Sequence, residues 1–404
     1  MKKGKVVIIG SGRSGRGLLG ELSYQDGYEI TFADIDQELI NKLNKNKKYI
    51  SFKEKGDGTY SEIIIKDFKA YHIFSDREKY IEALTNADII FTATFNDAFD
   101  QIIKDLQEAI DVHISRNTCK KTMFVVGANY VGLYDYFFEH INSSYTKKEL
   151  EYFEKNIALI ESIIYRMSSF PTQEQKAIDE LSIQNENYDY LRVNENHLAK
   201  ANQKMIPSFF LKDPDTKRYM QMKIWRGNTL HCSLAFMGNY YGLTYVCDAA
   251  NNKYIADRAF KAYKEANKGL TKEYGLEEDD KGFGDEFLSY CKDYGFKDAN
   301  NRVGNDPIRK LARNDRFIGP ALICIKNNII PKMICQNAAY GFFFRNDSDS
   351  RNLKLKEKIE KDGIEKTIQD VCGLDVSKES EKILYDMILA KYNELLDSKN
   401  ICGQ

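Results

Sequence analysis

The sequence predicts an α/β protein, with a Rossmann-type doubly wound sheet followed by a mostly α-helical C-terminal domain. Two observations support this prediction. In the first third of the chain, short β-branched runs alternate with helical patterns, which is typical of a parallel sheet covered by helices on both faces. From about Lys147 onward, long helical periods with charged faces replace that alternation. We therefore expect a Rossmann domain over residues 1–200 and a helical domain over residues 201–404.

The expected strands are short apolar runs that end at glycine or polar residues. Continuous runs of this kind suit parallel strands that are buried on both faces. They lie at Val6–Ile9, Glu29–Ala33, Asp88–Thr94 and Thr122–Gly127. Residues Ile63–Ile73 predict a small antiparallel excursion, and the polar residues 168–190 predict a loop or an insertion between domains. In the C-terminal half, Tyr254–Tyr274 and Arg351–Ile368 have the period of amphipathic helices.

Composition excludes several classes of protein. The 59 Lys and Arg residues balance the 60 Asp and Glu residues, whereas binders of nucleic acid or of anionic membranes need a basic surplus. The eight cysteines form no CxxC pair and no zinc-ligand spacing, so we expect reduced thiols and no metal. The apolar run Val6–Ile9 is too short for a signal peptide, and no stretch could span a bilayer. We expect a soluble cytoplasmic protein whose oligomeric state cannot be predicted.

A glycine-rich turn follows the first strand and opens a helix. In Gly10-Ser11-Gly12-Arg13-Ser14-Gly15, the first glycine permits a tight turn, the second lets backbone approach a pyrophosphate, and the third lets the helix pack on the strand. Asp34 ends the second strand, where its carboxylate can accept hydrogen bonds from both ribose hydroxyls and repel a 2′-phosphate. Asp36, with no Arg nearby, also favours NAD over NADP. The residues expected to bind NAD are Gly10, Gly12, Arg13, Ser14, Gly15, Asp34, Thr92, Ala93 and Thr94. A turn without ligand, or a site for FAD or a nucleotide sugar, remains as an alternative.

One of the five histidines lies in a cluster that could move a proton. Lys223, Asn228 and His231 fall within an arc of about 140° on a regular helix, so all three can face one cleft. A desolvated lysine can act as a base near neutral pH, while Asn and His can donate to a developing oxyanion. The alternative is an ordinary helix with an exposed Lys and a capped His.

The spacing Lys-x4-Asn-x2-His resembles the signature of the polyol-specific long-chain dehydrogenases, the mannitol dehydrogenase family. Further segments resemble the branch of that family that acts on mannitol 1-phosphate, and they occur in the expected order between about residues 5 and 395. These segments are Gly10–Gly20, Thr31–Asp36, Arg302–Pro320 and Gly-Leu-Asp at 373–375. The resemblance implies a metal-independent, NAD-dependent enzyme that interconverts a sugar alcohol and its ketose, foremost mannitol 1-phosphate and fructose 6-phosphate.

The resemblance also implies roles for individual residues. Lys223 would be the general acid/base, Asn228 and Asn129 would polarise the reacting oxygen, and His231 would contact the substrate. The domain over residues 1–200 would then bind NAD, and residues 201–404 would form the catalytic and substrate domain. The candidates for binding a sugar phosphate or the far hydroxyls of a polyol are Arg309, Lys310 and Arg316. Solvated cations on a helix and its following turn are the alternative.

Departures from the family pattern lie around the substrate more than around the cofactor. They are Ala128, Tyr165-Arg166-Met167, Asn194-Glu195-Asn196-His197, Gly227 and Leu230. Two alternatives therefore remain open: a dehydrogenase of a free polyol or of a hexuronate such as fructuronate or tagaturonate, and an NAD-binding protein without catalysis. In each case the expected partner is a small molecule, not a nucleic acid or a membrane.

Overall fold

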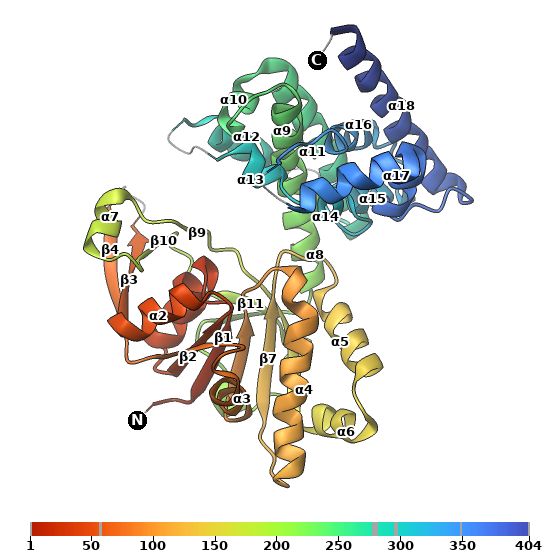
Figure 1. The fold of residues 1–404 in the computed structure, drawn as a ribbon. Coiled ribbons are helices and arrows are strands. Elements are labelled where there is room, and N and C mark those ends of the chain that lie inside the picture. Colours follow the sequence, from red (N-terminus) through yellow and green to blue (C-terminus); the bar gives the residue numbers. More distant parts are fainter. Residues whose placement is uncertain (1, 56–58, 277–281, 295–297, 348–349, 403–404) are drawn as a thin grey trace. The chain divides into compact units, whose positions relative to one another are not determined.

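A computed structural model describes residues 2–55, 59–276, 282–294, 298–347 and 350–402 (Figure 1). The chain divides into two compact units, an N-terminal unit of Met1–Lys217 and a C-terminal unit of Arg218–Gln404. The sequence placed the boundary at residue 200 and expected helix after Ile206. The N-terminal unit extends further because β12 (Phe210–Asp213) pairs in parallel with β11 (Leu191–Asn194). Four-residue strands give too little periodicity to be seen in a sequence.

The N-terminal unit is built on an eight-stranded sheet in the order β12-β11-β8-β7-β6-β1-β2-β5. All neighbouring strands pair in parallel except β8 and β11, which are antiparallel. The predicted Rossmann-type parallel sheet is therefore confirmed. The remaining strands of this sheet are β1 (Lys5–Ile9), β2 (Glu29–Asp34), β5 (Lys69–His72), β6 (Ile89–Thr92), β7 (Thr122–Gly127) and β8 (Ile157–Ile163).

Strand β1 lies between β2 and β6 and is buried on both faces. Val6 and Ile8 enter the hydrophobic core on one face of the sheet, while Val7 and Ile9 enter the core on the other. Helix α4 runs along the second face (Figure 1). The helices of this unit are α1 (Glu21–Gln25), α2 (Gln37–Asn46), α3 (Arg77–Thr85), α4 (Phe99–Ser115), α5 (Leu133–Ser144), α6 (Lys147–Asn156) and α7 (Gln173–Ile178).

A second sheet joins two distant parts of the chain, in the order β4-β3-β10-β9. The excursion predicted over Ile63–Ile73 is an antiparallel hairpin of β3 (Lys48–Glu54) and β4 (Tyr60–Lys66), whereas β5 returns to the main sheet. Residues 168–190, predicted as a loop or insertion, contribute β9 (Ser168–Ser169), α7 and β10 (Ile183–Asn185) to this sheet. Their strands are only two and three residues long, so polar composition concealed them.

The C-terminal unit is helical, as predicted. Helix α9 (Asn228–Tyr240) is its centre: Leu234, Phe236 and Met237 are fully buried, and α9 packs on α11 and α16. The other helices are α10 (Val246–Asn251), α11 (Lys253–Tyr274), α12 (Phe283–Lys292), α13 (Asn300–Gly304), α14 (Pro307–Leu311), α15 (Ile318–Lys326), α16 (Lys332–Gly341), α17 (Ser350–Cys372) and α18 (Glu379–Cys402). No helix within the described ranges is long and apolar enough to cross a membrane.

Candidate active site

The glycine turn connects β1 to the first helix, and each glycine has a distinct environment. Gly10 has φ +92°, and a Cβ there would lie 2.5 Å from the Ala93 carbonyl oxygen. A Cβ on Gly15 would lie 1.8 Å from the Gly10 oxygen, so only glycine fits where the helix crosses the strand end. A Cβ on Gly12 would meet no described atom within 4 Å. The open side of the turn is therefore at Gly12, where a cofactor would approach.

The helix after this turn begins as a π-helix, η1 (Gly15–Gly20), and continues as α1. Ser14 is its N-cap residue, and the Arg13 guanidinium lies 4.6 Å from the centre of the Phe170 ring. The predicted residues Gly10, Gly12, Arg13, Ser14 and Gly15 therefore share one strand-to-helix turn. Backbone N–H groups at such a helix start favour an anion.

Two carboxylates at the end of β2 have different roles. Asp34 accepts hydrogen bonds from the backbone N–H groups of Ser11 (2.6 Å) and Asp36 (3.0 Å), which fixes its carboxylate beside the glycine turn. Asp36 accepts from the Leu39 N–H (3.0 Å) and is the N-cap of α2. Its carboxylate thus has a local structural partner that the spacing did not reveal.

The end of β6 lies against the glycine turn. The buried Thr92 hydroxyl accepts from the Gly127 N–H (3.1 Å) within the sheet, and the Ala93 N–H donates to the Ile9 carbonyl (2.8 Å). The Thr94 hydroxyl is buried, yet it has no hydrogen-bond partner among the described residues. An unsatisfied buried hydroxyl beside an open glycine turn fits a dinucleotide that supplies the missing partner.

The C-terminal unit contains the other candidate residues, and a π-turn arranges them. Lys223 opens the π-helix η5 (Lys223–Gly227), which joins α8 (Thr216–Met222) to α9. The Asn228 N–H donates to the Lys223 carbonyl, five residues back. In a regular α-helix five residues turn through about 140° beyond one revolution, whereas a π-turn brings the two residues closer to one line. Half-buried Lys223, Asn228 and His231 therefore follow one another along one helix face.

Burial lowers the pKa values of both Lys223 and His231, but to different pH ranges. Burial lowers the pKa of Lys223 to about 8, close to the pH at which the amine can both accept and return a proton. Burial lowers the pKa of His231 to about 4, against the opposing effect of Asp298, so His231 is neutral near pH 7. Its Nε2 lies 3.5 Å from Asp298 Oδ2, and Arg302 Nε donates to Asp298 at 2.5 Å. Sequence reasoning missed Asp298, which no motif marks.

The predicted substrate-binding cations lie near α9 and are not equivalent. Arg309 is paired with Asp306 (3.2 Å) and Asp315 (3.1 Å), and the same Asp315 accepts from Arg316 Nε at 2.7 Å. Lys310 is only 5% exposed, yet no ion pair or hydrogen bond joins its Nζ to another part of the described chain. Burial, and secondarily the charge of Arg316, lowers the pKa of Lys310 to about 7. The charges of Lys310 and Arg316 also help to lower the pKa of His231, which places both within electrostatic range of it.

Asn129 belongs to the N-terminal unit. It is exposed two residues after the end of β7, at the edge of the sheet where the glycine turn also lies. Lys223, Asn228 and His231 belong to the C-terminal unit. Across the described ranges, no group of three or more His, Cys, Asp or Glu side chains is arranged to hold a metal ion.

Two family profiles match almost the whole chain. The Mannitol dehydrogenase Rossmann domain matches residues 4–206, and the Mannitol dehydrogenase C-terminal domain matches residues 215–397. The chain belongs to the mannitol dehydrogenase family. The resemblance seen in the sequence is thereby confirmed.

Curated relatives and solved structures agree with that family. The mannitol-1-phosphate 5-dehydrogenase of Thermoanaerobacter pseudethanolicus is 30% identical over 402 residues, 98% of each chain. That of Podospora anserina is 27% identical and covers 95% of this chain and 96% of its own. Pseudomonas fluorescens mannitol 2-dehydrogenase, solved with NAD and D-mannitol, has a TM-score of 0.75 at 11% identity, covering 98% of this chain and 92% of its own. At that identity the likeness establishes the mannitol dehydrogenase fold alone.

Proposed function

We propose that this protein is an NAD-dependent oxidoreductase that interconverts a sugar alcohol phosphate and its ketose, foremost mannitol 1-phosphate and fructose 6-phosphate. The observation that carries the proposal is Lys223, a lysine with a pKa of about 8 that lies one π-turn from Asn228. Relatives named mannitol-1-phosphate 5-dehydrogenase support the choice of substrate.

The cofactor would lie on the glycine turn, where it supplies hydride acceptance and donation. Gly12 leaves room for its pyrophosphate, and the Thr94 hydroxyl would gain the partner it lacks. Asp34, held by the Ser11 N–H, would accept from the ribose hydroxyls and disfavour a 2′-phosphate.

Lys223 would move the proton. In alcohol oxidation its neutral amine removes the hydroxyl proton as hydride leaves the carbon, and in ketose reduction the ammonium returns that proton to the oxygen. The amides of Asn228 and Asn129 would polarise the reacting oxygen. His231, neutral near pH 7, would exchange hydrogen bonds with a neighbouring substrate hydroxyl without adding charge.

Lys310 is the best candidate for the phosphate. Burial lowers the pKa of the Lys310 amine to about 7, and a bound phosphate would favour its charged form. Arg316 can contribute through the guanidinium nitrogens that do not bind Asp315, whereas Arg309 is already paired with two carboxylates.

The test is NADH consumption with fructose 6-phosphate, fructose, fructuronate and tagaturonate in parallel. Turnover confined to fructose 6-phosphate would support the full proposal. Turnover with an unphosphorylated ketose, abolished by Lys223→Met, would keep the chemistry and refute the phosphate role. NADH binding with no turnover of any of the four would refute the substrate assignment.

One observation favours an unphosphorylated substrate as the second candidate. Asp306 and Asp315 neutralise two of the three cations Arg309, Lys310 and Arg316, which leaves one net positive charge for a dianionic phosphate. A free polyol or a singly charged hexuronate would suit that charge. The parallel assay separates these substrates directly.

A further inference from the structure

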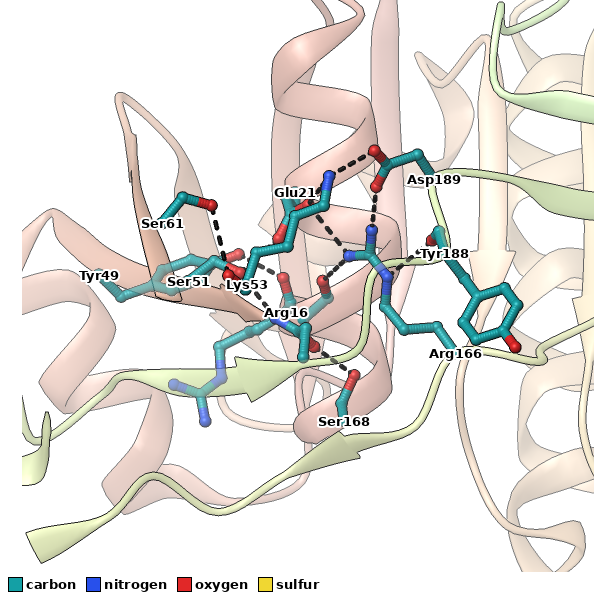
Figure 2. Close-up of polar contacts among 12 residues, drawn as sticks. Arg16, Glu21, Tyr49, Ser51, Lys53, Ser61, Arg166, Ser168, Tyr188 and Asp189 are labelled. Atoms are coloured by element: carbon teal, nitrogen blue, oxygen red, sulfur yellow. Dashed lines mark hydrogen bonds and ion pairs between the residues drawn. The ribbon is translucent and has the colours of Figure 1, made fainter. Parts of the chain in front are cut away.

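A cluster of polar and charged side chains, mostly buried, surrounds the helix that follows the glycine turn, and we call it the support cluster: Arg16, Glu21, Ser51, Lys53, Arg166 and Asp189 (Figure 2). At its centre, Arg166 Nη1 lies 3.0 Å from Glu21 Oε1, and both side chains are fully buried. Arg166 Nη2 donates to Asp189 at 2.6 Å, and Lys53 also pairs with Asp189. Removing one partner of so buried a pair leaves an uncompensated charge, so the cluster is tightly constrained.

Two arginines of the cluster and the neighbouring Tyr49 donate hydrogen bonds to backbone carbonyls of the turn and its helix. Arg166 Nη1 donates to the Gly17 oxygen (2.9 Å), and the Tyr49 hydroxyl donates to the Arg16 oxygen (2.7 Å). Arg16 Nε donates to the Ser11 oxygen (2.9 Å). Three carbonyls within Ser11–Gly17 therefore receive side-chain donors, two of them within η1.

Two of these donors, Tyr49 and Arg166, come from the second sheet and the chain beside it, whereas Arg16 belongs to η1. Tyr49 lies on β3, and Arg166 donates Nε to the Tyr188 oxygen (2.8 Å) between β10 and β11. Arg16 Nη1 donates to the Leu181 oxygen (2.6 Å), immediately before β10. A Cβ on Gly17 would lie 2.4 Å from Asn185 Oδ1 on β10, so this segment touches the helix backbone itself.

A π-turn is a rare deviation from the α-helix that occurs often at functional sites and persists only where its surroundings favour it. Here the deviation spans Gly15–Gly20, the first turn after the open glycine. The direction of the N–H groups that would meet a pyrophosphate depends on the geometry of that turn.

We propose that Arg166 and Tyr49 are positioning residues for the dinucleotide, which act by holding the first turn of the phosphate-binding helix in its π form. Residues 166–189, together with β3, are then the support of the cofactor site. This inference rests on the proposed NAD-dependent function. It makes Arg166, within the departure at Tyr165–Met167, a determinant of cofactor affinity that does not touch the cofactor.

The mildest test removes one hydroxyl. Tyr49→Phe deletes the hydrogen bond to the Arg16 oxygen, and Tyr28→Phe is its matched control. Tyr28 is equally buried (1% against 0% exposed), lies in the same unit and donates to the Met205 oxygen at 2.8 Å. NADH affinity is measured on the full chain by fluorescence titration, together with the midpoint of thermal unfolding.

We expect Tyr49→Phe to raise the Kd for NADH about three- to tenfold, the usual effect of one lost hydrogen bond, with Tyr28→Phe within about twofold of wild type. At saturating NADH, the KM for ketose should be unchanged in both variants. Equal changes of NADH Kd in the two variants would overturn the inference, because a merely structural hydroxyl would then explain the effect.

A second pair of variants tests the role of Arg166. Arg166→Lys keeps the charge opposite Glu21 and loses the forked donors, and Arg77→Lys is its control because Arg77 also bridges two carboxylates, Asp105 and Glu108. We expect a Kd for NADH at least about tenfold higher in Arg166→Lys only. An unchanged Kd in a folded Arg166→Lys would refute the positioning role, whereas wild-type protein that binds no NADH would refute the proposed function instead.

Discussion

The pH dependence of turnover follows directly from the position of Lys223. Burial lowers the pKa of its amine from 10.5 to about 8. In the proposed mechanism the neutral amine would be the base in alcohol oxidation, and the ammonium would be the acid in ketose reduction. The oxidation rate should therefore rise with pH through about 8 and level off above it, while the reduction rate should fall over the same range.

The size of the effect can be worked from the same shift. At pH 7 a pKa of about 8 leaves about one amine in eleven neutral, against about one in three thousand at a pKa of 10.5. Burial thus raises the population of the base about 300-fold at neutral pH. Lys223→Met removes the base altogether and should lower kcat at least about 10²-fold while NADH affinity stays near wild type.

The assay measures kcat for both directions between pH 6 and 10 with NAD(H) saturating. Lys391→Met is the control, because Lys391 lies in the same C-terminal unit, is only 5% exposed and pairs with Glu394 at the surface. A control with wild-type kcat shows that losing a buried lysine is not enough to abolish turnover. Rates that are independent of pH, or that change only near pH 10, would refute the role of a desolvated Lys223.

Three further outcomes are expected. Lys310→Met should raise the KM for fructose 6-phosphate at least about tenfold relative to Lys391→Met, because the substrate phosphate loses one charged hydrogen-bond donor. An unchanged KM would show that Lys310 does not bind the phosphate. Asp34→Ala should weaken the binding of NAD and lower the ratio of kcat/KM with NAD to kcat/KM with NADP. An unaltered ratio would contradict the ribose contact. Gly12→Val should fold with a wild-type unfolding midpoint yet lose NADH binding, whereas Gly15→Ala should lower the midpoint itself, since its Cβ would lie 1.8 Å from the Gly10 oxygen; similar midpoints in the two variants would argue against these separate roles.

The geometry of the glycine turn was predictable because its requirements are local. Gly10 is needed for a turn and Gly15 for a packing contact, both within six residues, and the apolar run before them is buried on both faces of the sheet. Asp36 shows the limit of such reasoning. A carboxylate near a predicted ribose site serves as a helix N-cap instead, and only its hydrogen bond to Leu39 distinguishes the two roles.

Contacts between distant segments left no comparable signal. Asp298 lies 67 residues after His231 in the chain, and Arg166 lies 149 residues after the Gly17 carbonyl that it binds. Within residues 168–190, Ser168 donates to Asn185, and Asn185 donates to Ser51 on β3, whereas residues 172–174 and 176–178 are exposed. A polar segment predicts a loop whether its side chains are hydrogen-bonded within a sheet or exposed to solvent.

The sequence does not reveal the two π-turns, and the physical reason is the same for both. A π-turn inserts one residue into a helical period, so the apolar pattern around Gly15–Gly20 and Lys223–Gly227 still reads as an ordinary helix. Donors from other segments, Tyr49 and Arg166, bind carbonyls of the first π-turn, and at the second the Asn228 N–H donates to the Lys223 carbonyl. Both occur in segments that the proposed function assigns to ligand binding or proton transfer. The positions at which the periodic reading fails are therefore the positions at which the proposed chemistry makes its strictest geometric demands.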